Sequence, residues 1–172
     1  MRHFAAIVMV LIAFSYTNQI NSPTEFESTV RTYPEVRVLS SYSEKDVECL
    51  ARNIYHESRG EPVDGQLAVA QVTINRWHKN PKRSLCTVVY SQNEYGCQFS
   101  WVCEDTKLPK RSSQVWQQSV VLARTALTLS ANGLYCCKGL ENALYFHSVT
   151  VHPRWSKTRT LIGRIGNHVF YS

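Results

Sequence analysis

The stretch "ECLARNIYHESRGEPVDGQLAVAQVTINR" (residues 48–76) predicts two consecutive helices with a sharp break between them. The first begins at Ser43, with Asp46 completing an approximate capping box, and ends at Gly60. Its inner face recurs at helical spacing, at Val47, Leu50, Ala51, Ile54 and Ser58. The second helix starts with Pro62 in its first turn and stops before Pro81. Its apolar positions follow the same period, at Val63, Leu67, Ala70, Ile74 and Trp77.

The rest of the chain divides into a loop-rich middle, a third helix and a strand-rich end. Residues 91–110 mix aromatic, amide and hydroxyl side chains. A helix is predicted over 114–131, capped by Ser112 or Ser113 and closed by Gly133. Three short strand patterns follow, at 142–149, 158–165 and 167–172. Helices first and strands last favour a single α+β domain over residues 43–172.

Composition and charge narrow the class of protein. The chain has 172 residues, 44% of them hydrophobic, which is enough to bury a core in one domain. Its net charge of +6 favours an anionic partner. The basic residues are scattered, and no predicted helix or strand interleaves them with aromatics, so we expect no nucleic-acid binding. We expect a monomer.

The amino terminus predicts export. "MRHFAAIVMVLIAFSY" (residues 1–16) places a basic residue before an apolar run that is short for a membrane span and typical of a signal peptide. No small-x-small triplet marks a cleavage site, so residues 1–17 are either a signal peptide or a retained anchor, which would tether the chain to a membrane. Residues 18–42 are polar and contain two prolines, and we interpret them as a linker or arm. The expected location is the periplasm or the cell wall outside the membrane.

The six cysteines also indicate an oxidising compartment outside the cytoplasm. An even number behind an export signal indicates disulfides, and no Cys/His spacing resembles a zinc site. Cys97 and Cys103 are close enough to staple one loop. Cys136 and Cys137 are adjacent, so we expect them to pair with different partners. The alternative is that one pair of the six cysteines forms no disulfide and only fills buried apolar space. The full connectivity stays open at this point.

The residues around the helix break allow metal binding, acid catalysis or simple helix termination. His56 and Glu57 begin like the zinc motif H-E-x-x-H, but Gly60 stands where the second histidine belongs. We therefore expect no metal and no cofactor. Glu57 continues the helical row that contains Leu50 and Ile54, at the margin of the apolar stripe. Desolvation there would raise its pKa and suit it to protonate a glycosidic oxygen. Spacing alone favours the alternative, a solvated glutamate at the helix edge, and the family motif described below reverses that preference.

A second acid and an aromatic loop complete a candidate sugar site. Glu61 follows the break and is either a structural cap or the second carboxylate of a hydrolase pair. Gln98 and Ser100 offer hydrogen bonds to sugar hydroxyls. Phe99 and Trp101 offer flat faces to sugar rings, although we expect at least one of them to belong to the core.

Three motifs in order carry a family resemblance. Residues 48–76, "YGCQFSWVCED" (95–105) and "ALYFHSVTVHPRWSK…IGNHVFY" (143–157 and 165–171) resemble the SleB/CwlJ cell wall hydrolase domain, the family of the spore cortex-lytic enzymes. The resemblance covers roughly residues 46–171. Ser58 departs from it by standing where the family commonly has alanine, and no separate peptidoglycan-binding repeat is present.

The resemblance implies a lysozyme-related fold, peptidoglycan as substrate and Glu57 as the catalytic acid. The family's second acid falls on Glu61, and its aromatic-amide loop falls on residues 98–101. Its late motif falls on Tyr145, His147, Trp155, Asn167 and His168, which we expect to line or support the substrate groove. The expected reaction is cleavage between N-acetylmuramic acid and N-acetylglucosamine. If Glu57 is the only catalytic acid, the enzyme is a lytic transglycosylase. If Glu61 positions a water molecule, it is a muramidase. The alternative that is not an enzyme is a peptidoglycan-binding protein without catalytic activity.

Overall fold

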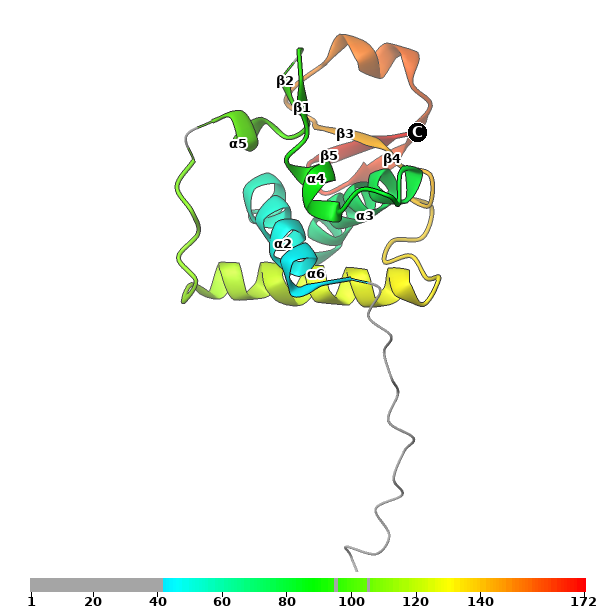
Figure 1. Cartoon of the computed structure of the whole chain (residues 1–172). Coiled ribbons are helices and arrows are strands. Elements are labelled where there is room, and N and C mark those ends of the chain that lie inside the picture. Colours follow the sequence, from blue (N-terminus) through cyan, green and yellow to red (C-terminus); the bar gives the residue numbers. More distant parts are fainter. Residues whose placement is uncertain (1–41, 95, 105) are drawn as a thin grey trace, which may run out of the picture. The chain divides into compact units, whose positions relative to one another are not determined.

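The two predicted helices are present as α2 (Glu44–Ser58) and α3 (Val63–Lys79), and they form the centre of the fold (Figure 1). The computed structural model describes residues 42–94, 96–104 and 106–172. The predicted export segment and nearly all of the predicted arm lie outside the described residues. The capping box at the start of α2 is present: the Ser43 hydroxyl accepts from the Asp46 N–H, and the Asp46 carboxylate accepts from the Ser43 N–H. The predicted inner face of α2 is buried along its whole length.

Helix α3 is buried on more sides than its sequence pattern predicts. It lies between two hydrophobic clusters: Ala70 and Ile74 belong to the one formed with α2 and α6, while Ala68 and Val72 belong to the one under the C-terminal sheet. Val63, predicted to face the core, is exposed because it starts the helix outside both clusters. A helix covered on two sides has no single apolar stripe, which is why a simple periodic pattern describes α3 poorly.

The long helix α6 (Gln114–Ala131) has the predicted bounds and packs across α2 and α3 (Figure 1). Ser113 is its cap, through its hydroxyl and the Trp116 N–H. Two short helices, α4 (Leu85–Val89) and α5 (Ser100–Cys103), were not predicted. Among the helices that the structure describes, none has the length and apolar character needed to cross a bilayer.

The C-terminal strands form one antiparallel sheet in the order β3–β5–β4. Their bounds are β3 (Tyr145–Ser148), β4 (Leu161–Ile165) and β5 (His168–Tyr171). The 3-10 helix η1 (Arg154–Thr158) lies between β3 and β4 in the chain, and a small hairpin, β1 (Gln92–Asn93) and β2 (Gly96–Cys97), precedes α5. Helices followed by antiparallel strands confirm the predicted α+β class.

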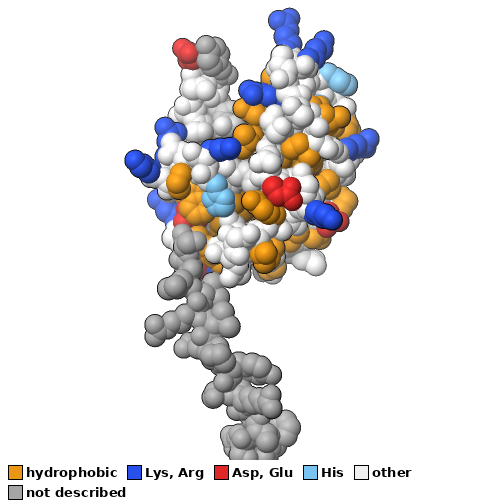
Figure 2. Space-filling view, turned by 90° about the vertical axis from the view of Figure 1, so that its right-hand side faces the viewer, with side chains coloured by type: hydrophobic (Ala, Val, Ile, Leu, Met, Phe, Trp, Pro, Cys, Tyr) orange, Lys and Arg blue, Asp and Glu red, His pale blue; other side chains and the backbone are white. Residues whose placement is uncertain are grey.

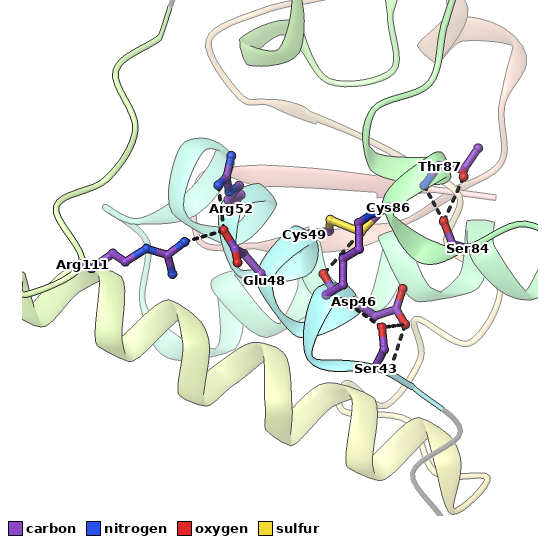
Figure 3. Close-up of a disulfide and its surroundings, with 10 residues drawn as sticks. Ser43, Asp46, Glu48, Cys49, Arg52, Ser84, Cys86, Thr87 and Arg111 are labelled. Carbon is purple, nitrogen blue, oxygen red and sulfur yellow. Dashed lines mark hydrogen bonds and ion pairs between the residues drawn. A yellow bond between two sulfur atoms is a disulfide. The ribbon is translucent and has the colours of Figure 1, made fainter.

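Two disulfides staple the domain. Cys49–Cys86 joins α2 to α4, with the Glu48 ion pairs to Arg52 and Arg111 nearby (Figure 3). Cys97–Cys103 closes the short loop between β2 and the end of α5, as predicted. The expectation that Cys136 and Cys137 pair with different partners is wrong, because the other four cysteines pair among themselves and both of these thiols are free. The alternative, that one pair of cysteines stays outside the disulfides, is confirmed.

Candidate active site

A cavity of about 660 Å³ opens between segments that are distant in the chain, and Arg76 of α3 and His168 of β5 also line it. The last turn of α2 forms its floor, the β2–α5 segment forms one wall, and the segment from β3 to η1 forms the other. Figure 2 shows a notch between two projecting parts at the top of the molecule, with Lys and Arg side chains on these projections. The predicted site residues that line it are Glu57, Gln98, Phe99, Ser100, Trp101, His147, Trp155 and His168.

Glu57 lies on the cavity in the last turn of α2, just before the chain breaks at Gly60. Burial raises the pKa of its carboxyl from 4.5 to about 7, while the nearby Arg76 charge opposes this rise and the Glu104 charge adds to it. Removal from water is the dominant cause, because an ionised carboxylate loses more hydration than a neutral one. Glu57 is thus a carboxylic acid that holds its proton close to neutral pH.

Arg76 faces the same cavity from the last turns of α3. Its Nε donates to the Leu144 carbonyl at 2.7 Å, and its guanidinium carbon lies 5.2 Å from the centre of the Phe99 ring. Burial lowers its pKa to about 10, which leaves it charged at neutral pH. Its Nη1 is buried and has no hydrogen-bond partner among the described residues. The sequence interpretation missed Arg76; a charged side chain at the end of the apolar run of α3 was the available signal.

The two aromatic side chains of the loop at residues 98–101 are more deeply buried than side chains that stack on sugar rings would be. Phe99 and Trp101 are only 4% and 8% exposed and belong to the core, so the expectation that at least one is a core residue is confirmed for both. The Trp101 Nε1 donates to the Asn53 Oδ1 at 3.0 Å, and the His56 ring stacks on the indole at 4.5 Å between centroids. Their exposed neighbours Gln98 and Ser100 present the polar groups of this wall.

The opposite wall comes from the sheet and η1. The His147 Nδ1 lies 2.9 Å from the Ser148 carbonyl oxygen, which only accepts, so Nδ1 carries the proton and donates to it. In the neutral ring Nε2 then accepts from the Tyr171 hydroxyl at 3.0 Å. Trp155 packs edge-on against the His147 ring. His168 is buried, which lowers its pKa, and its Nδ1 has no partner among the described residues.

Three predicted site residues lie away from this cavity. Tyr145 lines a neighbouring cavity of about 170 Å³ together with Arg76, and the Arg159 guanidinium covers its ring at 4.2 Å. Glu61 and Asn167 bond to each other: the Glu61 carboxylate accepts from the Asn167 N–H at 2.8 Å and from its side-chain amide at 3.2 Å. Pro62 holds the N-cap position of α3, so the interpretation of Glu61 as the side-chain cap of that helix is wrong.

The second acid that does line the cavity is Glu104, at the end of α5, which the sequence interpretation missed. It is exposed, and its charge contributes to the raised pKa of Glu57. Within the described residues, no cluster of three or more His, Cys, Asp or Glu side chains is arranged to hold a metal ion. The chemistry available to the cavity is that of a protonated glutamic acid, a buried cation and polar groups suited to hydroxyls and amides.

Fold and cavity together define a small disulfide-stapled α+β domain with one desolvated glutamic acid in an open groove. The chain belongs to the cell wall hydrolase family, whose model matches residues 60–171. The resemblance of its three motifs to the spore cortex-lytic enzymes is therefore confirmed.

Curated relatives include two spore cortex-lytic enzymes. The protein from Oceanobacillus iheyensis is 33% identical over 138 residues, which cover 80% of this chain and 45% of the relative. The protein from Bacillus cereus is 28% identical over 155 residues, covering 90% of this chain and 52% of the relative. The chain thus spans about half the length of these relatives.

Solved structures share the fold. The catalytic domain of the germination-specific lytic transglycosylase SleB from Bacillus anthracis matches with a TM-score of 0.57 and 30% identity, over 77% of this chain and 98% of that domain. The catalytic domain of Bacillus cereus SleB matches with a TM-score of 0.53 and 28% identity, over 76% of this chain and 92% of that domain. The predicted lysozyme-related α+β fold is confirmed by these matches.

Proposed function

We propose that this chain is a lytic transglycosylase that cleaves peptidoglycan between N-acetylmuramic acid and N-acetylglucosamine. One observation carries the proposal: Glu57 lies in an open cavity with a pKa raised to about 7 by burial. An acid with this pKa keeps its proton at neutral pH and can still release it to a leaving group. The family and the solved lytic transglycosylase domain of the same fold point to the same substrate.

In the proposed reaction Glu57 acts twice. As an acid it protonates the glycosidic oxygen, so the bond to the muramic C1 breaks and an oxocarbenium-like centre develops. As a carboxylate it then takes the proton from the muramic C6 hydroxyl, whose oxygen bonds to C1 and forms the 1,6-anhydro product. Glu57 ends protonated and no water is consumed. The charge of Arg76 favours the intermediate carboxylate, because an opposite charge nearby stabilises the ionised form.

The remaining lining residues would hold the glycan. Gln98 and Ser100 on one wall, with His147 and His168 on the other, offer donors and acceptors for the acetamido and hydroxyl groups of the sugars. Trp155, which also lines the cavity, offers an aromatic side chain. Because peptidoglycan lies outside the cytoplasmic membrane, the chain would act in the periplasm or the wall, in keeping with two disulfides and the predicted export segment.

A muramidase is the second candidate function, because Glu104 also lines the cavity and is a second carboxylate there. Hydrolysis needs a carboxylate that positions water or traps the sugar. Glu61, the group predicted for that role, already accepts two hydrogen bonds from Asn167. In this version of the mechanism Glu104 would take the role of the second acid.

The products of sacculus digestion distinguish these reactions. Purified sacculi are incubated with the full chain, with Glu57→Gln and with Glu104→Gln, and the released fragments are analysed by mass spectrometry. We expect anhydro-muramic ends from the wild type and from Glu104→Gln, and none from Glu57→Gln. Reducing muramic ends that disappear in Glu104→Gln would establish the muramidase instead. Wild-type turnover by a folded Glu57→Gln variant would exclude both mechanisms, and binding without release by the wild type would favour a peptidoglycan-binding protein.

A further inference from the structure

Cys136 and Cys137 are adjacent in the chain, and they are the two cysteines that no disulfide contains. The proposed reaction does not involve them. Their sulfur atoms lie 4.0 Å apart. All six cysteines of the chain lie within the described residues, and the other four are bonded to each other on different elements. Each of these thiols therefore has the other as its only free thiol partner within the chain.

Both sulfur atoms are held against α3. The Cys136 Sγ lies 3.3 Å from the Leu67 carbonyl oxygen and 3.2 Å from the Gln71 Oε1, and the Cys136 N–H donates to the same Oε1 at 2.9 Å. The Cys137 Sγ lies 3.9 Å from the Asp64 carbonyl oxygen. Cys136 is half-buried and Cys137 is buried, so a small oxidant reaches the pair more easily than a second protein does. No third metal-binding side chain joins them among the described residues.

We propose that Cys136 and Cys137 form a reversible redox site that closes to a disulfide between adjacent residues. The oxidant is a low-molecular-weight disulfide. One thiolate attacks it and forms a mixed disulfide, releasing one thiol of the oxidant. The second thiolate then attacks the bonded cysteine sulfur and releases the other thiol. The chain loses two electrons and two protons, which the two released thiols carry.

The covalent geometry of adjacent residues makes this disulfide easy to reduce. Neighbouring Cα atoms across a trans peptide are about 3.8 Å apart, which is below the separation of about 4.4–6.8 Å that ordinary disulfides span. The ring therefore closes under strain, and strained disulfides have higher reduction potentials than structural ones. By comparison, the Cα atoms of Cys49 and Cys86 are 5.3 Å apart, within the ordinary range.

Closure would alter how the segment after α6 is attached to α3. Gln71, which receives the Cys136 N–H, donates to the Asn75 Oδ1 at 2.8 Å. Asn75 in turn donates to the carbonyls of Leu140 and Ala143, both at 2.8 Å. Oxidation removes both S–H donors and leaves the Leu67 carbonyl without its thiol contact. The reduced form is therefore the better-attached and more stable form.

The test equilibrates the full chain with mixtures of reduced and oxidised glutathione, traps free thiols with iodoacetamide under denaturing conditions and measures mass. At the reduced end we expect both thiols to be alkylated. At the oxidised end we expect no alkylation, no glutathione adduct and a peptide around residues 136–137 lighter by two hydrogen atoms. This bond should open at a reductant concentration roughly tenfold or more below that needed for Cys49–Cys86. The melting temperature should be lower for the oxidised form.

Variants separate this site from other thiol chemistry. Cys136→Ser leaves one thiol, which should take up glutathione or alkylate but never lose two hydrogen atoms; Cys136→Ala serves if the serine variant does not fold. In Cys136→Ser/Cys137→Ser the melting temperature should no longer depend on the redox mixture. Persistent alkylation of both thiols at the oxidised end, stable glutathione adducts, or dimers linked through Cys136 would each overturn the proposal. None of these measurements depends on the enzymatic activity.

Discussion

The carboxylate of Glu61 accepts two hydrogen bonds from Asn167, a residue 106 positions further along the chain. This contact joins the break between α2 and α3 to the turn between β4 and β5. It therefore connects the helix that carries Glu57 to the sheet that carries His147 and His168. Both hydrogen bonds are exposed to solvent, so together they contribute only about 1 kcal/mol.

Gly166 is required for that contact, and Gly166→Ala should lower stability by about 2–3 kcal/mol. Its φ of +56° disfavours any side chain, and a Cβ there would collide with the Glu61 Oε2. Gly163→Ala is the matched control, because a Cβ on this glycine of β4 meets nothing within 4 Å and needs no positive φ. Urea unfolding of both variants is the measurement. Equal losses in the two variants would show that neither the positive φ nor the Glu61 contact sets the effect.

Glu57→Gln should stabilise the fold at alkaline pH while it abolishes activity. The folded-state pKa of Glu57 is raised to about 7 from 4.5, so the unfolded chain releases this proton first as pH rises. Stability that is present below pH 4.5 is therefore lost through the window up to about 7. The amide variant does not ionise and should be more stable than the wild type by roughly 3 kcal/mol at pH 8, with no such difference at pH 4. Thermal unfolding at both pH values checks this.

Arg76 and Glu104 should shift the pH–activity profile in opposite directions. The active form needs protonated Glu57, so activity falls as pH rises through its pKa. Arg76→Gln removes a charge that lowers this pKa, so it should shift the alkaline limb of the profile to higher pH by roughly one pH unit or less. Glu104→Gln removes a charge that raises this pKa, so it should shift the alkaline limb to lower pH. The measurement is the initial rate of sacculus digestion from pH 5 to pH 9. Shifts in the same direction would exclude this electrostatic account.

The two disulfides should contribute unequally to the free energy of unfolding. Cys49–Cys86 closes a separation of 37 residues and Cys97–Cys103 one of only 6. Loop-closure entropy predicts a loss of about 4 kcal/mol for Cys49→Ala/Cys86→Ala and about 2 kcal/mol for Cys97→Ala/Cys103→Ala. Denaturant unfolding of the two double variants measures both. A larger loss at Cys97–Cys103 would mean that this bond stabilises the cavity wall by some route other than chain entropy.

Local signals in the sequence predicted the helices well. Capping and periodic burial depend on residues within one or two turns, so Ser43 marks the start of α2 and the bounds of α6 were predicted correctly. The α3 pattern failed at Val63 because burial there depends on α6 and the sheet, which lie far away in the chain. Short helices such as α4 are too brief to show a period.

The sequence by itself determined the order of elements and the class of fold, and its family motif, rather than helical spacing alone, singled out Glu57 as the predicted catalytic acid. Tertiary structure decided the neighbours of that carboxyl. It brought Arg76 and Glu104 to the cavity, bonded Glu61 to Asn167, buried Phe99 and Trp101, and left Cys136 and Cys137 unpaired. The physical reason is range: helix periodicity is set by neighbours in sequence, whereas pKa values, cavity walls and disulfide partners are set by side chains that meet only when distant segments pack.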